Sequence, residues 1–288
     1  MKLSMNYDDI YYTVTDGLKL YARDYSAAQS DAEVLLCMHG LSRNSADFEP
    51  LVDALGDRYR ILVVDQRGRG KSQWDDKPER YQILNYVNDM WQLLDQLGVD
   101  RVTLIGTSMG GLMGMVMAAQ QPDRVRGLVI NDVGPEVAAE GLDRIMSYVG
   151  KAPAIENWDD AVAYTRSINA VCFPDFSDSQ WLTMAQRLYR EDARGVPVAA
   201  YDPKISAPIK SDEAAAVPTD LWPLFRGLSI PLLAIRGALS DLLSKECFLR
   251  MQKEQAAMFV VEVDGVGHAP VLDEPQAVDA IQRFLRRL

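Results

Sequence analysis

Cysteine is scarce in this sequence, and its placement argues against two kinds of site. Cys37, Cys172 and Cys247 are scattered along the chain, and no two of them stand at CxxC spacing. An odd number of separated cysteines predicts neither a disulfide framework nor a zinc site. We therefore expect no bound metal and, as the default, a reducing cytoplasmic location.

Long apolar runs are also missing. No stretch approaches the length of apolar sequence that a membrane-spanning helix needs. The first residues, MKLSMNYDDIYYTVTDG, carry early acids and no apolar core, so they lack the character of a secretory signal. These absences favour a protein that does not partner with membranes.

Positive charge is in deficit, because 30 Lys and Arg face 41 Asp and Glu and give a net charge of −11. An acidic surface repels phosphate backbones and anionic lipid, so nucleic acid and membranes are poor candidate partners. The remaining composition is that of an ordinary globular protein, with 48% hydrophobic residues in a chain of 288. We expect a small molecule as the partner, and nothing in the sequence indicates a particular oligomeric state.

Six short apolar runs predict buried strands. They lie at 34–38, 60–65, 102–106, 127–132, 231–237 and 258–265, and each ends in turn residues. Nearly continuous apolar character is typical of parallel strands that helices cover on both faces. Segments with helical spacing, such as YVNDMWQLLDQLG, separate several of them. The sequence therefore predicts an α/β protein with a doubly wound, mostly parallel sheet.

Two segments depart from this alternation. The first, IYYTVTDGLKLYARDY, predicts an antiparallel hairpin that turns at Asp16-Gly17. The second, between about Pro135 and Thr219, has helical apolar spacing, and strand character returns with PLLAIRG. We expect residues 1–134 and 220–288 to form the core, and residues 135–219 to form a helical cap inserted before the last two strands.

The stretch LIGTSMGGLMG crowds glycines around one serine, Ser108, between a predicted strand and a predicted helix. It fits G-x-S-x-G, and a strand–turn–helix context is what a nucleophile elbow requires. Side chains at Gly106 and Gly110 would collide across such a turn. The pattern therefore predicts that Ser108 is a nucleophile, with the backbone N–H of Met109 as one oxyanion donor.

A histidine and an aspartate also follow predicted strands. His268 lies in VDGVGHAP and Asp241 lies in RGALSD. Because ligands bind at the carboxyl ends of the strands in such sheets, both side chains are expected near Ser108. We assign His268 as the base and Asp241 as the acid that orients it, in the chain order Ser, Asp, His.

These assignments have alternatives. His39, in MHGLS, is the other histidine, and we expect it to be structural. Asp132, which follows GLVIN, and Asp264, which stands near the assigned histidine, are the alternative acids. The motif DQRGRGKS lacks the spacing of a phosphate loop, so we expect it to shape a loop beside the site.

The motifs GxSxG, HG, DxRGxGxS, G-x-x-S-D and G-H-x-P, in the right order and at strand ends, resemble the α/β-hydrolase superfamily. The resemblance covers essentially the whole chain. NDVGPE and GVGHAPxLDEP are similar to the capped esterase and C–C hydrolase group. The resemblance implies an eight-stranded α/β-hydrolase fold with no cofactor, and a second oxyanion donor at the backbone N–H of Leu41.

The residues and the resemblance together predict a serine hydrolase that cleaves a small, mainly apolar ester through an acyl-enzyme. The alternatives are a C–C hydrolase acting on a diketone-type ring-cleavage product, a lactonase and a hydrolase-fold ligand receptor. The motifs do not separate them, because the cap residues that line the pocket decide the substrate. Among the cap arginines, Arg166, Arg187 and Arg190, we expect a solvated face, with the alternative that one reaches the cleft and binds a carboxylate.

Overall fold

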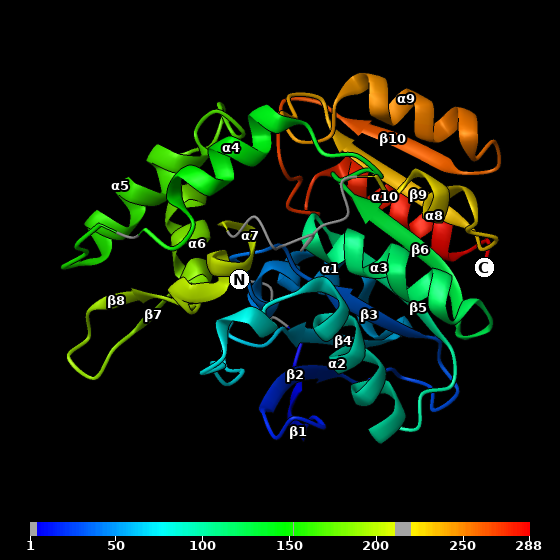
Figure 1. Ribbon diagram of the computed structural model, residues 1–288, viewed down its shortest axis with the longest axis horizontal. Helices are drawn as coiled ribbons and strands as arrows, with labels where there is room; N and C mark the ends of the chain where they lie inside the picture. Colours follow the sequence, from blue (N-terminus) through cyan, green and yellow to red (C-terminus); the bar gives the residue numbers. More distant parts are fainter. Residues whose placement is uncertain (1–4, 152, 211–219) are drawn as a thin grey trace.

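The computed structural model of the chain describes residues 5–151, 153–210 and 220–288. An eight-stranded sheet with the order β1-β2-β4-β3-β5-β6-β9-β10 forms its centre (Figure 1). The strands are β1 (Asp8–Thr13), β2 (Lys19–Tyr25), β3 (Val34–Met38), β4 (Arg60–Asp65), β5 (Val102–Thr107), β6 (Val125–Asn131), β9 (Leu232–Gly237) and β10 (Phe259–Val263). β2 pairs antiparallel with β1 and β4, and the other neighbouring strands are parallel. The predicted fold class is confirmed.

The central strands are buried on both faces of the sheet. In β3, Leu36 packs into one apolar cluster and Cys37 into another, and in β5 Leu104 and Ile105 divide in the same way. All four side chains are fully buried. Successive side chains of a strand point to opposite faces, so a continuous apolar run suits a strand that lies between two helical layers.

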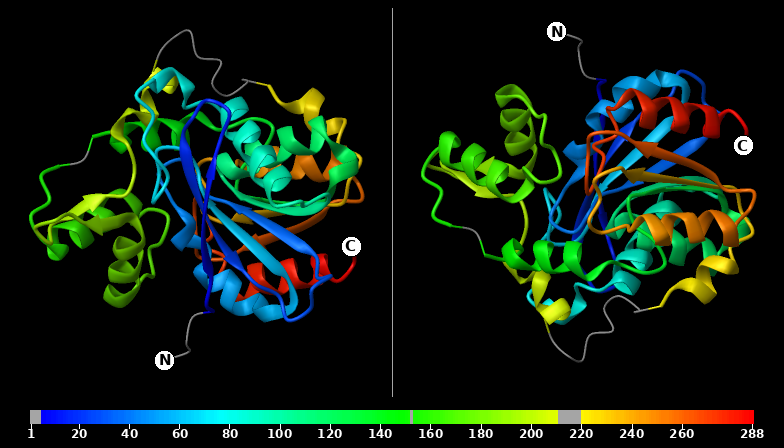
Figure 2. Two further views of the ribbon diagram at one scale, coloured as in Figure 1. Left: turned by 90° about the horizontal axis from the view of Figure 1, so that it is seen from below. Right: turned by 90° about the horizontal axis from the view of Figure 1, so that it is seen from above.

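Helices form the two outer layers of this core (Figure 2). They are α1 (Glu49–Leu55), α2 (Ile83–Gln96), α3 (Met109–Gln120), α8 (Trp222–Arg226), α9 (Lys245–Glu254) and α10 (Pro275–Leu285). The apolar sides of α2, α3, α8 and α9 share one cluster, and those of α1 and α10 share the other. α3 is buried along most of its length, which explains why its sequence is apolar on all sides.

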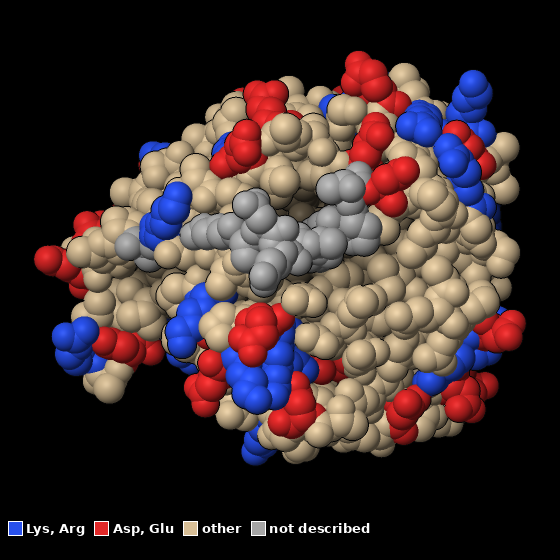
Figure 3. Space-filling view, in the orientation of Figure 1, with Lys and Arg blue, Asp and Glu red and all other residues tan. Residues whose placement is uncertain are grey.

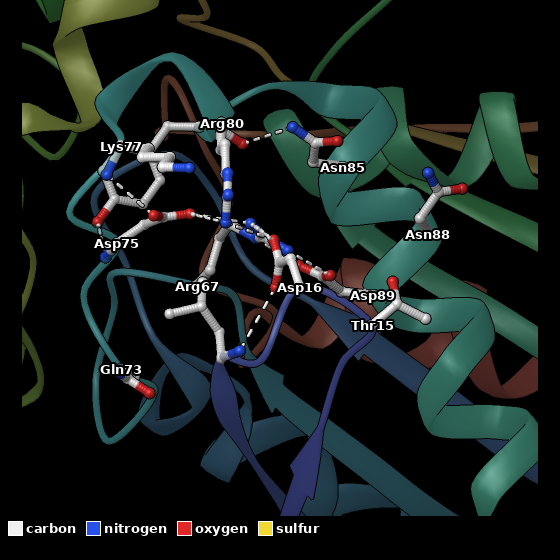
Figure 4. A network of polar contacts seen from close by, with 12 residues as sticks. Thr15, Asp16, Arg67, Gln73, Asp75, Lys77, Arg80, Asn85, Asn88 and Asp89 are labelled. Atoms are coloured by element: carbon white, nitrogen blue, oxygen red, sulfur yellow. Dashed lines mark hydrogen bonds and ion pairs between the residues drawn. The ribbon is translucent and has the colours of Figure 1, made fainter.

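A buried ion-pair network fixes the loop after β4, which contains DQRGRGKS (Figure 4). Arg67 donates two hydrogen bonds to Asp89 of α2, at 2.7 and 2.6 Å. It also pairs with Asp75 at 3.0 Å and with Asp16, in the turn between β1 and β2, at 2.8 Å. Burial raises the pKa of Asp89 to about 6, and the charge of Arg67 opposes that rise. The motif therefore shapes a loop, as expected, and joins it to the hairpin and to α2.

The chain between β6 and β9 leaves the sheet, and we call its described residues, 135–151 and 153–210, the inserted segment. It contains α4 (Ala139–Tyr148), α5 (Trp158–Asn169), α6 (Asp178–Leu188), β7 (Tyr189–Glu191), β8 (Pro197–Ala199) and α7 (Ala207–Lys210). Besides its helices it holds an antiparallel pair, β7 with β8, that the sequence did not suggest. The end of the predicted cap, residues 211–219, lies outside the described residues. The division of the chain into core and cap stays a prediction.

The inserted segment lies at the carboxyl ends of the parallel strands. The arrowheads of β6 and β10 point to its side of the molecule in Figure 1. The contacts that attach it to core loops include a β-bridge between Arg69 and Tyr201 and a hydrogen bond from Nδ2 of Asn44 to the carbonyl of Arg187 at 2.6 Å. Ligands bind at this edge in open α/β sheets, so the inserted segment is placed where it can contact one.

The surface carries charges of both signs. On the face shown in Figure 3, acidic and basic side chains gather in small mixed groups around a broad uncharged area. None of the helices in the described ranges is long and apolar enough to cross a membrane.

Candidate active site

Ser108 lies on the turn between β5 and α3, at the carboxyl end of the sheet. Its backbone angles, φ 53° and ψ −117°, fall where residues other than glycine are rarely found. The carbonyl of Asn131 accepts its N–H at 2.9 Å. A Cβ at Gly106 would overlap the carbonyl of Gly110, and a Cβ at Gly110 would overlap the carbonyl of Met38. The predicted collision across the turn is confirmed for Gly106, whereas the backbone that requires a glycine at position 110 belongs to the neighbouring strand β3.

The imidazole of His268 lies between Ser108 and Asp132. Its Nε2 is 2.9 Å from Oγ of Ser108, and its Nδ1 is 2.8 Å from Oδ2 of Asp132. An ionised carboxylate only accepts hydrogen bonds, so the proton of the neutral ring belongs on Nδ1. Nε2 is then free to accept the hydrogen bond of the serine hydroxyl. The three side chains form one continuous hydrogen-bonded chain.

Asp132 is fully buried, and both of its carboxylate oxygens accept hydrogen bonds. The N–H of Gly237 donates to Oδ1 at 2.7 Å, and the hydroxyl of Ser240 donates to Oδ2 at 2.6 Å. With the Nδ1–H of His268, three donors surround the carboxylate. A buried carboxylate needs such partners, because its separation from water is otherwise unfavourable by several kcal/mol.

Asp241, which the sequence suggested as the acid, is engaged elsewhere. Its carboxylate forms an ion pair with Arg144 of α4, in which Nη2 lies 2.9 Å from Oδ1. The prediction that Asp241 orients His268 is therefore wrong, and the alternative, Asp132, takes that position.

The sheet order explains the difference. β6 is the direct neighbour of β5, so the residue that follows β6, Asp132, lies beside the turn that carries Ser108. Asp241 stands four positions beyond the end of β9, one strand further away, in a loop that meets the inserted segment. The motif G-x-x-S-D still contributes to the site, because Ser240 donates to Asp132.

The remaining alternatives have structural contacts. His39 is fully buried, with Nε2 accepting the N–H of Gln66 at 3.1 Å and Nδ1 lying 2.7 Å from the carbonyl of Gly40. Burial lowers the pKa of His39 to about 3, so this ring stays neutral and supports the loop beside the site. Asp264 is exposed, and its carboxylate accepts a hydrogen bond from Gln276 at 2.9 Å.

The two predicted oxyanion donors lie beside Ser108. Leu41 lines the same cavity, and Met109 opens α3, where the first N–H groups have no acceptor within the helix. Arg69, which is fully buried, donates to the carbonyl of Leu41 at 2.9 Å, and its Nη2 lies 3.8 Å from Sδ of Met109. The guanidinium also lies 4.8 Å from the ring centroid of Tyr86. The donor role of Leu41 and Met109 stays a prediction, and Arg69 is a neighbour that the sequence did not single out.

Asn131 is a second residue that the sequence reasoning missed. Its backbone carbonyl accepts the N–H of Ser108, and its Nδ2 donates to Oγ1 of Thr107 at 3.1 Å and to the carbonyl of Pro270 at 2.8 Å. One buried amide thus joins the turn that holds the serine to the loop that holds His268. The feature of the sequence that could have identified Asn131 is its position immediately before Asp132 in GLVIND.

A cavity of about 120 Å³ opens over Ser108 and His268. The inserted segment supplies about half of its lining, and most of that lining is apolar or aromatic. The lining residues from the inserted segment are Ile145, Tyr148, Tyr164, Ile168, Asn169, Phe173, Met184, Arg187, Leu188, Tyr189, Ala199 and Tyr201. Those from the core include Gly40, Leu41, Ser42, Arg43, Asp47, Phe48, Thr107 and Val271.

The arrangement has the parts that acyl transfer needs. A serine hydroxyl hydrogen-bonded to an imidazole, with a carboxylate behind the ring, can lose its proton while it attacks a carbonyl carbon. Within the described ranges, no three His, Cys, Asp or Glu side chains are gathered so that they could hold a metal ion.

Comparison with known proteins agrees with this geometry. Residues 33–167 match the family model described as the alpha/beta hydrolase fold. The chain is 34% identical over 261 residues to a 3-hydroxybutyrate-oligomer hydrolase of Cupriavidus necator, with 88% of this chain and 89% of that protein covered. It is 30% identical over 236 residues to a 2-(acetamidomethylene)succinate hydrolase of Mesorhizobium japonicum, with 82% and 81% covered.

A solved structure extends the likeness over the full length. The crystal structure of an α/β hydrolase from Novosphingobium aromaticivorans has a TM-score of 0.93 and 40% identity, and the match covers 99% of this chain and 100% of that one. The sequence motifs, the strand order and these relatives agree with one another. The chain belongs to the α/β-hydrolase family.

Proposed function

We propose that this chain is a serine hydrolase that cleaves a small carboxylic ester through an acyl-enzyme formed on Ser108. The observation that carries the proposal is the hydrogen-bonded chain from Ser108 through His268 to Asp132, with distances of 2.9 and 2.8 Å. This geometry supports nucleophilic catalysis independently of any relative, because a serine hydroxyl is a poor nucleophile unless a base accepts its proton.

The reaction proceeds in two halves. Oγ of Ser108 attacks the ester carbonyl carbon while its proton passes to Nε2 of His268, and the same proton then leaves with the alcohol. Water next attacks the acyl-enzyme and gives its proton to Nε2, which returns it to Oγ as the acid departs. Asp132 holds the ring in place and stabilises the imidazolium that forms in each half.

The oxyanion of each tetrahedral intermediate needs preorganised donors. We assign this role to the backbone N–H groups of Leu41 and Met109. The peptide group that carries the N–H of Leu41 is held at its carbonyl end, because the carbonyl oxygen of Gly40 lies 2.7 Å from Nδ1 of the buried His39. Arg69 holds the following peptide group, through the carbonyl of Leu41 at 2.9 Å.

The inserted segment acts in this proposal as a lid that limits substrate size. A cavity of about 120 Å³ is close to one of about 150 Å³ that holds benzene, so only small groups fit beneath the segment. The apolar lining favours substrates with some apolar surface, and a few polar groups orient them. Proteins and polysaccharides do not fit such a cavity.

The two curated relatives support an acyl compound as the substrate. One is named for hydrolysis of 3-hydroxybutyrate oligomers, which are esters, and the other for hydrolysis of an acetamido derivative of succinate. We favour the ester, because that relative has the higher identity and the larger coverage. Hydrolysis of a compound like the succinate derivative is the second candidate.

A parallel turnover screen tests the proposal. The substrates are p-nitrophenyl esters of increasing acyl length, the 3-hydroxybutyrate dimer, 2-(acetamidomethylene)succinate, small lactones and vinylogous diketones. We expect turnover of short esters. Their kcat/KM should rise with acyl length, because each methylene that fits contributes up to about 0.8 kcal/mol of binding free energy, and should fall once the cavity is full.

The Ser108→Ala variant is the control for the same screen. The variant should lose about 10³-fold or more in kcat, because the hydrogen-bonded residues act as a unit. Activity above a tenth of the wild-type value would contradict the serine mechanism. Turnover of diketones or lactones without turnover of esters would replace the proposed reaction with one of the alternatives.

A further inference from the structure

One arginine of the cavity lining has a buried nitrogen that no group of the described residues satisfies. Arg187 stands in the last turn of α6 and lines the cavity that contains Ser108 and His268. Its side chain is only 18% exposed. In the part of the chain that the structure describes, its Nε is buried and makes no hydrogen bond. A buried donor without a partner is unfavourable, so this group is suited to an acceptor that arrives with a ligand.

The neighbouring acids do not satisfy Arg187. Oε2 of Glu49 lies 3.9 Å from its Nε, which is beyond hydrogen-bond distance. The other oxygen of Glu49 accepts a hydrogen bond from Arg23 at 2.8 Å. Burial raises the pKa of Asp273, and the charge of Arg187 opposes this rise, so Asp273 is also within electrostatic reach. Asp273 is also partly open to water, which weakens its attraction for the guanidinium.

The second arginine of the cavity has its own partner. Arg43 forms two hydrogen bonds to Asp47, at 2.6 and 2.8 Å, in the side-by-side geometry that suits a guanidinium and a carboxylate. The lining contains three residues with a permanently charged type of side chain, namely Arg43, Asp47 and Arg187. These three side chains carry one net positive charge, and Arg187 is the arginine among them without a hydrogen-bonded carboxylate.

The other two arginines that the sequence raised as candidates are not placed to bind a ligand in the cavity. Arg166 is 46% exposed and pairs with Asp178. Arg190 is exposed and lies 5.9 Å from the ring centroid of Trp74. Neither belongs to the cavity lining.

The core fixes the position of Arg187. Nδ2 of Asn44, a buried residue, donates to the carbonyl of Arg187 at 2.6 Å. Oδ1 of the same Asn44 accepts the N–H of Ala46, so the asparagine is held at both ends. The end of α6 is thereby attached to the loop below it, and the guanidinium starts from a fixed backbone position.

We infer that Arg187 binds a carboxylate carried by the substrate, so that the enzyme acts on small esters that bear a free carboxylate away from the ester bond. The inference rests on the proposed function, because it assigns the substrate class of the same site. A guanidinium recognises a carboxylate through two parallel hydrogen bonds, and an apolar cavity strengthens that contact.

Two substrates that differ in one group test the inference. One is the mono-p-nitrophenyl ester of adipic acid, and the other is the same compound with its free carboxylate replaced by a primary carboxamide. The wild-type enzyme should prefer the carboxylate compound in kcat/KM by about tenfold to a hundredfold, the range expected for a charged hydrogen bond. Arg187→Gln should remove this preference by lowering kcat/KM for the carboxylate compound, with a much smaller effect on the amide.

Two further variants sharpen the comparison. Arg187→Lys keeps the charge without the paired donors and should keep part of the preference. Arg190→Gln removes an exposed arginine three positions further along and should leave the preference unchanged. The melting temperature of each variant shows whether the inserted segment is still folded.

The outcomes separate the inference from the proposed function. Equal wild-type turnover of both compounds, or an equal loss on both in Arg187→Gln, would overturn the inference and leave the hydrolase proposal standing. If neither compound is turned over, the hydrolase proposal fails for these esters. Calorimetric titration of both compounds into Ser108→Ala, with and without Arg187→Gln, then decides whether Arg187 binds a carboxylate. Equal affinity for both compounds would contradict it.

Discussion

Asp132 and His268 are 136 positions apart in the chain, yet Oδ2 of one lies 2.8 Å from Nδ1 of the other. The first follows β6 and the second follows β10, so the contact crosses the carboxyl edge of the sheet. It brings the ring to a position where its other nitrogen meets Ser108. The proposed chemistry depends on this contact, because it orients the ring that accepts the proton of the serine hydroxyl.

Asp132→Asn should lower kcat by about 10³- to 10⁴-fold with little change in the fold, because an amide favours the wrong tautomer of the ring. Asp241→Asn should keep kcat within about tenfold of wild type, since a residue outside the reacting chain leaves the tautomer intact. Its effect should appear instead as a lower melting temperature, because the ion pair with Arg144 is lost. Steady-state kinetics of the two variants make the comparison, and the opposite order of losses would return the acid role to Asp241.

Asn131→Ala should lower kcat by up to about a hundredfold, because small displacements of reacting groups are costly. The variant loses the amide that joins Thr107 to the carbonyl of Pro270, so Ser108 and His268 are no longer held at a fixed distance from each other. KM should change much less, because this side chain is not among the residues that line the cavity. Asn85→Ala is the control, because it removes an amide of α2 that donates to the carbonyl of Arg80 and to no residue of the site. A change confined to KM would contradict the positioning role.

Acid should destabilise the protein partly through His39. The pKa of this ring is about 3 in the folded state, against 6.5 for an unperturbed histidine. Below about pH 6.5 the unfolded chain binds a proton that the folded chain does not, so stability falls as pH falls through this window. The residue should contribute a loss of about 2 kcal/mol between pH 7 and pH 5.

Urea unfolding of wild type and His39→Gln at these two pH values measures that contribution. The amide oxygen of Gln can reach the position of Nε2 and accept the N–H of Gln66, but it cannot take up a proton. The variant should therefore lose about 2 kcal/mol less than wild type on acidification, whatever its stability at pH 7. An identical pH dependence in both proteins would show that His39 is not the group responsible.

The strands and the serine turn could be predicted because their causes are local. A run such as VLLCM is apolar throughout, and only a position between two helical layers suits it. Gly106, in the turn that carries Ser108, is required by the carbonyl of Gly110, which is only four positions away. These constraints can be recognised in the amino-acid sequence.

The acid and the substrate-binding residues could not be predicted in the same way. Asp132 and Asp241 both follow strands. Which of them meets His268 depends on the folded positions of their two loops and on the salt bridge between Asp241 and Arg144. Arg187 and Arg190 lie three positions apart, close to one face of a helix by spacing. The end of α6 at Leu188 and the hydrogen bond from Asn44 distinguish them in the folded chain: Arg187 lines the cavity, and Arg190 lies at the surface.

The most direct test of the central claim is to map the site of covalent labelling by a fluorophosphonate, which phosphonylates an activated serine. The account predicts one adduct per chain, on Ser108, with loss of ester turnover in proportion to labelling and much slower labelling of a His268→Ala variant. Tandem mass spectrometry of the digested protein locates the adduct. An adduct on another residue, or complete labelling of Ser108 with turnover retained, would contradict the assignment of Ser108 as the nucleophile.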